Sequence, residues 1–205
     1  MPTTTVAEDV RARVRRAPNG SFVRPADLPG SRSAVLTALS RLHADGGLVR
    51  VRNGLYWKGV SSRFGPGRPS LLEAAVSAAG NRGAGPAGWS ATQVLGWATQ
   101  LPATPEVAVA GPAPTLAGVR FHRRNNTARR DLGFYEVALI EALRDFPRYS
   151  EVDIESFART VARLEAEGKV RLARVKRVAA SEHSPALRRN LEAVTELLGQ
   201  AAPHE

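Results

Sequence analysis

Apolar residues near the start of the chain recur with helical spacing. Val6, Val10 and Val14 stand four positions apart with charged residues between them, which predicts an amphipathic helix over residues 6–17. A Pro-Asn-Gly sequence follows and ends that helix. The next stretch predicts only a short extended piece at residues 21–23, followed by a single helical turn in a proline-rich segment.

A second amphipathic helix is predicted over about residues 32–44. Its apolar positions fall on one face, Ser31 is placed to cap its N-terminus, and two glycines end it. The opposite face carries arginine and short hydroxyl side chains. Residues 48–52 then alternate apolar and basic, as a half-buried strand does, and the Asn-Gly that follows predicts a tight hairpin to a returning strand at 55–58.

The rest of the chain predicts a second, mainly helical domain. Residues 61–69 hold two glycines and two prolines, which predicts a linker. The glycine-rich segment 80–88 lacks the Gly-Lys-Ser/Thr ending of a phosphate-binding loop and is expected to be a flexible connector. The expected helices span residues 71–79, 91–99, 134–145, 153–167, 170–179 and 185–198, and the expected strands span 107–109 and 119–121.

These patterns predict the α+β fold class, mainly helical. We expect a winged helix-turn-helix domain over residues 1–60, a linker over 61–69, and a mixed, helix-rich domain over 70–205. The 43% of hydrophobic residues is enough to build ordinary buried cores in a chain of 205 residues.

Composition narrows the class of protein. The chain has no cysteine, which excludes a disulfide framework, a thiolate metal site and a cysteine nucleophile. It has no apolar run of membrane-spanning length, and its N-terminal sequence lacks the apolar core of a signal peptide. We therefore expect a cytoplasmic protein with no membrane partner.

The charge balance points to a polyanionic partner. Lysine and arginine number 29 against 19 acidic residues, for a formal net charge of +10. A field of that sign favours association with nucleic acid or with an acidic protein surface.

The predicted order of helix, turn, helix and tight hairpin is that of a winged helix, which uses its second helix to read the major groove of DNA. On that helix we assign Arg32, Ser33 and Thr37 to base or near-base contacts, because such side chains read base edges. Ser40 and Arg41 are assigned to phosphate contacts. The predicted DNA-binding residues, with the cap and the wing included, are Ser31, Arg32, Ser33, Thr37, Ser40, Arg41, Arg50, Arg52, Asn53 and Lys58.

Two other interpretations of this region remain open. The hairpin charges are also compatible with a solvated hairpin that contacts nothing, and a winged helix can serve protein contact instead of DNA binding.

The second helix and the hairpin also resemble a known family. The similarity is carried by residues 31–57, which read SRSAVLTALSRLHADGGLVRVRNGLYW and resemble the N-terminal domain of AbiEi-type antitoxins. These are antitoxins of the type IV toxin–antitoxin, or abortive-infection, class. The similarity continues through the Gly-x-Ser-Ala, Leu-Gly and Gln-x-Pro features of residues 88–102 and through the helix 132–147, which contains Glu-Ala-Leu at 141–143. It covers about residues 20–150.

The resemblance implies a non-enzymatic protein with two tasks. The N-terminal domain would bind repeats in its own promoter as an autorepressor, and the C-terminal domain would counteract a toxin with a nucleotidyltransferase fold. The alternative is a stand-alone winged-helix transcriptional regulator whose C-terminal domain senses a ligand or dimerises. A nucleic-acid-processing enzyme that docks through the winged helix is a third hypothesis.

Candidate catalytic and metal-binding groups are sparse, and we expect no cofactor and no metal. The four histidines are scattered without ligand spacing, with His43 expected at a helix end and His204 in the tail. Ser90 lacks the flanking glycines of a nucleophile elbow. Asp153 and Glu155 are expected at a helix start, where acidic side chains are favourable, and not as an acid/base pair.

One basic cluster is left with three interpretations: a solvated loop, a second contact to DNA phosphates, or a docking surface for an acidic toxin. The cluster consists of Arg120, Arg123, Arg124, Arg129 and Arg130, beside His122.

Trp89 and Trp97 are expected to pack in the core.

Overall fold

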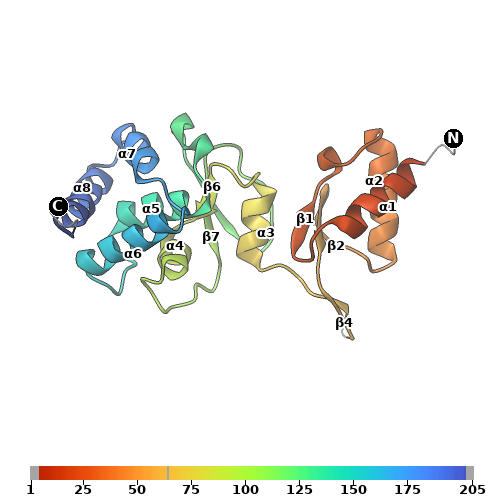
Figure 1. Ribbon diagram of the computed structural model, residues 1–205, viewed down its shortest axis with the longest axis horizontal. Helices are drawn as coiled ribbons and strands as arrows, with labels where there is room; N and C mark the ends of the chain where they lie inside the picture. Colours follow the sequence, from red (N-terminus) through yellow and green to blue (C-terminus); the bar gives the residue numbers. More distant parts are fainter. Residues whose placement is uncertain (1–4, 64, 202–205) are drawn as a thin grey trace. The chain divides into compact units, whose positions relative to one another are not determined.

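The computed structural model describes residues 5–63 and 65–201, which fold as two compact units, Met1–Ala74 and Ala75–Glu205 (Figure 1). Within the described ranges the chain forms eight α-helices and eight short strands. This confirms the predicted α+β, mainly helical class. The division between the units falls inside α3 (Leu71–Ala78), beyond the predicted linker. None of the helices described is both long and apolar enough to cross a bilayer.

The helices of the first unit begin and end close to where the sequence predicts. Helix α1 (Val6–Arg16) starts with a capping box between Thr5 and Glu8. Strand β1 (Ser21–Val23) and the 3₁₀ turn η1 (Pro25–Asp27) follow. Helix α2 (Arg32–Ala44) is capped by Ser31, whose Oγ accepts the backbone N–H of Ala34 at 3.4 Å.

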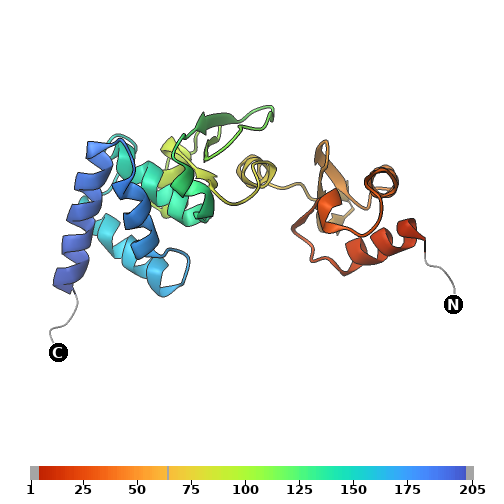
Figure 2. The ribbon, with the colours of Figure 1, turned by 90° about the horizontal axis from the view of Figure 1, so that it is seen from above.

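A small antiparallel sheet completes this unit. Strands β2 (Val49–Arg52) and β3 (Leu55–Lys58) form the predicted hairpin, with a positive φ at Gly54 in its turn. Strand β1 pairs with the other edge of β3, giving the order β1-β3-β2. Figure 2 shows α2 end-on in orange, with the hairpin beside it. The order of helix, short strand, turn, helix and hairpin is the order predicted from the sequence. The core is formed by Val10, Val14, Val23, Val35, Ala38, Leu39, Leu48 and Tyr56.

The predicted linker is not a free linker. Strands β4 (Ser61–Ser62) and β5 (Gly65–Pro66) form a second small hairpin. The indole N–H of Trp57 donates to the carbonyl of Gly67 at 2.9 Å, which ties the segment to β3. A Cβ on Gly59, just before this segment, would lie 2.1 Å from that same carbonyl oxygen, so Gly59 permits the close backbone approach of Gly67.

The glycine-rich segment 80–88 was predicted to be flexible, and this prediction is wrong. It contains strand β6 (Ala84–Pro86), which is buried and pairs with β7 (Glu106–Val109). A Cβ on Gly85 would lie 2.7 Å from the Cβ of Val137. Glycine is needed because β6 packs directly against a helix.

The second unit combines a three-stranded sheet with five helices beyond α3. The sheet has the order β6-β7-β8, antiparallel between β6 and β7 and parallel between β7 and β8 (Arg120–Arg123). Helix α5 runs through the centre of the unit and packs on α4, β6 and α8. The elements are α4 (Gly88–Leu95), η2 (Thr127–Asp131), α5 (Phe134–Asp145), α6 (Ile154–Ala166), α7 (Leu172–Ala180) and α8 (Pro185–Ala201).

The aromatic residues of this unit serve packing. Trp97 is 1% exposed and stacks on Phe157 in the core, as predicted. Trp89 is half-buried and meets the edge of Tyr149, with ring centroids 5.4 Å apart. Helix α4 ends earlier than predicted because Gly96 adopts a left-handed conformation (φ 77°).

Candidate nucleic-acid interface and a buried charge cluster

The outward face of α2 is lined by short hydroxyl side chains. Ser33, Thr37 and Ser40 are all exposed, and their spacing of four and three residues places them on one face, opposite Val35 and Leu39. The Thr37 hydroxyl donates to the carbonyl of Ser33 at 3.0 Å. Short side chains let the helix backbone come close to whatever lies on this face.

Two arginines accompany that face. Arg32 stands in the first turn of α2 and Arg41 in the last, and both are exposed. Neither forms an ion pair with any residue in the described ranges. Ser31 is occupied as the N-cap, and its Oγ also lies 3.3 Å from that of Ser33. The two guanidinium groups are therefore available to an anionic partner, whereas the Ser31 hydroxyl already has a structural task.

The hairpin between β2 and β3 presents a smaller polar tip. Arg50 and Asn53 are exposed, and the Arg50 guanidinium donates to Oδ1 of Asn53. Arg52 is half-buried and sits at a register shift in the β2–β3 pairing. The tip is thus held by its own hydrogen bond, with remaining guanidinium donors facing outward.

Lys58 does not extend from the wing as predicted. Its ammonium donates to the backbone carbonyls of Arg15 at 2.8 Å and Ala17 at 2.5 Å, at the C-terminal end of α1. These carbonyls lack partners within the helix, and a cation is favoured at that end. The structure therefore reassigns Lys58 from a DNA contact to a cap of α1.

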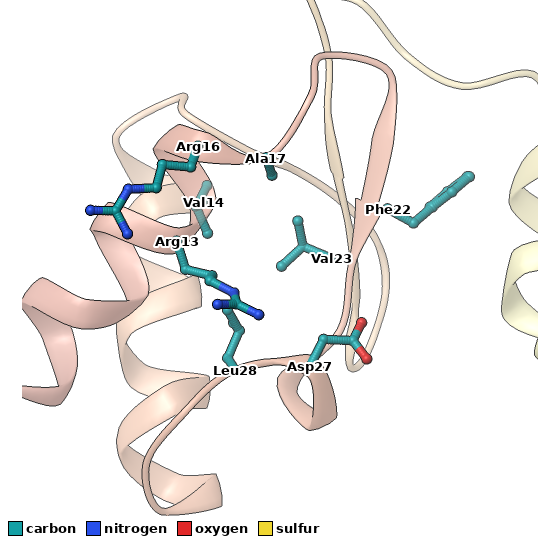
Figure 3. A pocket seen from close by; sticks show the side chains of 8 residues that line it. All are labelled: Arg13, Val14, Arg16, Ala17, Phe22, Val23, Asp27 and Leu28. Atoms are coloured by element: carbon teal, nitrogen blue, oxygen red, sulfur yellow. The ribbon is translucent and has the colours of Figure 1, made fainter.

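A cavity of about 330 Å³ opens between the end of α1, β1 and η1 (Figure 3). The side chain of Arg13 points into it toward Asp27, and Arg16 points away. Its lining includes none of the residues predicted to contact DNA. It is formed by Arg13, Val14, Arg16, Ala17, Phe22, Val23, Asp27 and Leu28.

The basic cluster of the second unit is not one surface. Arg123 and Arg130 are exposed, and the side chain of Arg120 is 64% exposed with Nη1 3.9 Å from Oε2 of Glu106. Arg129, by contrast, is only 1% exposed, and Arg124 is largely buried. Of the three interpretations of this cluster, none holds for Arg129, because a side chain that is 1% exposed is neither solvated nor able to contact DNA or a toxin.

The buried arginines converge on two carboxylates. Glu141 of α5 is 0% exposed and accepts hydrogen bonds from Arg124, whose Nε lies 3.0 Å away, and from Arg129. Glu182, in the turn between α7 and α8, accepts from Arg129 and Arg144. The cluster therefore links the residue after β8 and η2 with α5 and the α7–α8 turn.

Both carboxylates are held in the ionised form. Burial opposes the charge of Glu141, but the hydrogen bonds and positive charges of Arg124 and Arg129 outweigh it and lower the pKa of Glu141. Burial likewise opposes the charge of Glu182, but the hydrogen bond and positive charge of Arg129, with smaller contributions from Asn126 and Arg144, lower the pKa of Glu182. At neutral pH the cluster therefore consists of fully charged partners.

Glu141, Arg144 and Glu182 were not singled out as site residues from the sequence. A usable signal was present at Glu141, which interrupts an apolar run in α5. A carboxylate at such a position is almost never fully buried unless it is paired. Glu182 offered no comparable signal, because it lies in a polar turn.

Three of the other candidate groups, Asp153, His43 and His122, have structural partners. Oδ1 of Asp153 accepts the backbone N–H of Ser156 at 2.8 Å, which confirms the expected helix cap. His43 lies at the end of α2 with Nδ1 3.0 Å from the carbonyl of Leu48. Nε2 of His122 is 2.6 Å from Oε2 of Glu106. His204 lies outside the described residues.

Comparisons with known proteins do not assign a family. No family model and no curated protein matches the chain. Among solved structures, the crystal structure of the RV2827C protein from Mycobacterium tuberculosis aligns with 96% of this chain and 81% of its own, at 16% identity and a TM-score of 0.41. At this TM-score the likeness does not establish a shared fold.

Proposed function

We propose that the first unit binds duplex DNA, with α2 in the major groove and the β2–β3 hairpin beside the backbone. The observation that carries the proposal is the exposed face of α2. It combines a stripe of short hydroxyl side chains with arginines that have no ion pair in the described ranges. A helix of this kind fits the dimensions of the groove.

The polar side chains of α2 fall into two groups, one suited to base contacts and one to phosphate contacts. Ser33 and Thr37 lie where short side chains reach base edges, and Arg32 at the helix start supplies a longer donor. Ser40 and Arg41 lie nearer the end of α2 and suit phosphate contacts. The net charge of +10 adds an attraction that does not depend on sequence.

We further propose that this DNA binding is autorepression by an antitoxin of the AbiEi type, with the second unit counteracting a nucleotidyltransferase-fold toxin. The resemblance of residues 31–57 and 88–102 supports this form of the function. Co-expression with the toxin encoded beside the gene tests it, and failure to protect cells would remove the antitoxin role while leaving DNA binding intact.

A stand-alone regulator whose second unit senses a ligand is the second candidate. A cavity of about 400 Å³ beside the buried charge cluster favours it. A neighbouring gene without nucleotidyltransferase character would strengthen this candidate against the antitoxin.

The direct test is a mobility-shift titration on the DNA upstream of the gene, repeated on random DNA across a salt series. We expect Arg32→Ala/Arg41→Ala to abolish the preference for the upstream DNA and to lower the slope of log K against log salt by about one, because Arg41 is the phosphate contact of the two. The matched control is Arg11→Ala/Arg15→Ala, which removes two exposed charges from α1 instead.

The control variant should keep the preference for the upstream DNA. Equal, steeply salt-dependent binding to both DNAs, little changed by either double variant, would reduce the interaction to net charge alone. A protein-contact role for the winged helix would then replace the proposal.

A further inference from the structure

The second unit contains a cavity of about 400 Å³ at the point where its buried charge cluster reaches the surface. Its walls come from the end of β8 and the following loop, from the last turn of α5, and from the α7–α8 turn. A cavity of this volume is within the range that holds small molecules. The lining residues are Arg123, Arg124, Asn125, Asn126, Thr127, Arg144, Ser181, Glu182 and His183.

Positive charge exceeds negative charge around this cavity. Arg123, Arg124 and Arg144 line it, against Glu182 as the one lining carboxylate among the described residues. Glu182 is already engaged by Arg144 and by Arg129 behind the wall. Arg123 has no ion pair within the described ranges, so its guanidinium stands at the cavity uncompensated.

Asp145 is the other carboxylate close to the cluster. It follows Arg144 on α5 but is not part of the cavity wall. Burial and the neighbouring charge of Glu141 raise the pKa of Asp145, so its environment disfavours further negative charge on that side. Among the described residues, Glu182 is therefore the one carboxylate in the cavity wall.

Two guanidinium donors of the cluster are buried without an acceptor. They are Nε of Arg144 and Nη2 of Arg129, whose side chain is 1% exposed. A buried donor left unsatisfied costs free energy, and the cost is larger on a charged group. Arg144 itself lines the cavity, so an acceptor placed there would lie next to the cluster that holds these donors.

We propose that this cavity binds a small anion that carries a phosphate group, either free phosphate or the phosphate monoester of an organic molecule. Phosphate offers several acceptor oxygens to convergent guanidinium groups, and arginine recognises it with paired hydrogen bonds. The bonds to Glu141 and Glu182 fix Arg124 and Arg144 in advance, which lowers the entropy lost on binding. The cavity is also larger than phosphate alone requires, which leaves room for an attached organic group.

The proposal does not depend on DNA binding, because every lining residue belongs to the second unit. It is tested on the full-length protein by isothermal titration at constant ionic strength. The probes are inorganic phosphate, adenosine 5′-monophosphate and adenosine. Saturable binding of a phosphate-bearing probe, with none of adenosine, is the expected result.

The variants locate the site. Arg123→Gln removes an exposed lining charge that supports no other contact in the described ranges, and we expect it to weaken binding about tenfold. Arg120→Gln is the matched control, since it lies on the same strand but three residues away, on the opposite face. Arg144→Gln is a second test variant, with folding checked by circular dichroism.

Adenosine 5′-monophosphate binding more tightly than inorganic phosphate would identify a nucleotide-like ligand, and equal affinities would identify phosphate itself. The proposal is overturned if neither phosphate probe binds at millimolar concentration. It is also overturned if binding survives unchanged in both Arg123→Gln and folded Arg144→Gln, or if Arg123→Gln weakens DNA binding and leaves the small probes unaffected.

Discussion

Glu141 illustrates how a single buried charge organises its surroundings. It is 0% exposed within an apolar stretch of α5, where an unpaired carboxylate would be very unfavourable. Arg124, just after β8, and Arg129 of η2 neutralise it, so the cluster holds these segments against α5. A buried ion pair of this kind adds little net stability over apolar packing, but it favours one arrangement over others.

Removing one partner of this cluster should be costly. We expect Glu141→Gln to lower the free energy of unfolding by about 3–5 kcal/mol, because Arg124 loses its carboxylate partner and the buried Arg129 keeps only Glu182. Denaturant unfolding followed by circular dichroism measures the change. The control is Glu167→Gln, which breaks the exposed pairs to Arg163 and Lys169 and should leave the midpoint nearly unchanged. Equal effects of the two substitutions would contradict this account.

The same carboxylates predict sensitivity to acid. The folded pKa values of Glu141 and Glu182 lie below the ordinary value of 4.5, so the unfolded chain binds protons first as pH falls. Their stabilisation is complete above pH 4.5 and is lost as the pH drops through the lower folded values. Denaturant midpoints measured from neutral to acidic pH should therefore fall less steeply in Glu141→Gln and Glu182→Gln than in the wild type.

At the scale of elements, helical periodicity predicted the bounds of helices whose apolar faces and caps are set by nearby residues. Helices α2 and α5 have the predicted bounds because their apolar faces and caps are local features. Segment 80–88 was misjudged because glycine permits both flexibility and close packing. Only the distant residue against which a glycine packs decides between the two, and local sequence does not identify that residue.

The candidate sites also differ in whether local sequence predicts them. The exposed face of α2 follows from its apolar face, so its polar residues were predicted from the sequence. The fate of the arginines in and after β8 depends on carboxylates in other elements. Arg129 meets Glu182 from 53 residues away, and nothing local distinguishes Arg129 from exposed Arg130.

The packing of β6 on α5 gives a prediction of its own. We expect Gly85→Ala to destabilise the protein by about 1–3 kcal/mol, since the added Cβ would lie 2.7 Å from the Cβ of Val137 and 2.8 Å from the carbonyl of Phe134. The matched control is Gly111→Ala, where nothing lies within 4 Å of the new Cβ. Thermal unfolding of both variants checks this, and similar losses at the two sites would refute close packing at Gly85.

On the scale of the whole molecule, the apolar residues form two separate cores. One is built from α1, α2 and the β1-β3-β2 sheet, and the other surrounds α5 in the second unit. Cooperative unfolding follows shared buried surface, and a chain with two cores can open one while the other persists. Each unit also has its own long-range polar contact. Lys58 binds carbonyls at the end of α1 in the first unit, and Glu141 binds Arg124 in the second.

Substituting one of these polar contacts in each unit tests whether the two units unfold independently. Lys58→Met removes the cation that binds the last carbonyls of α1, with an expected loss of about 0.5–1 kcal/mol. In amide hydrogen exchange followed by mass spectrometry, this variant should raise exchange in peptides of α1 and α2 and leave α5 unchanged. Glu141→Gln should do the reverse.

The reciprocal pattern separates two accounts of the chain. If each unit unfolds on its own, exchange changes stay within the unit that carries the substitution, and the DNA binding proposed for the first unit survives Glu141→Gln. If both substitutions raise exchange in both units, the chain unfolds as one cooperative body. In that case an effect of any second-unit variant on the proposed DNA binding would reflect global stability. Arg123→Gln then separates the proposed ligand binding from folding, because the Arg123 side chain makes no ion pair or hydrogen bond in the described ranges.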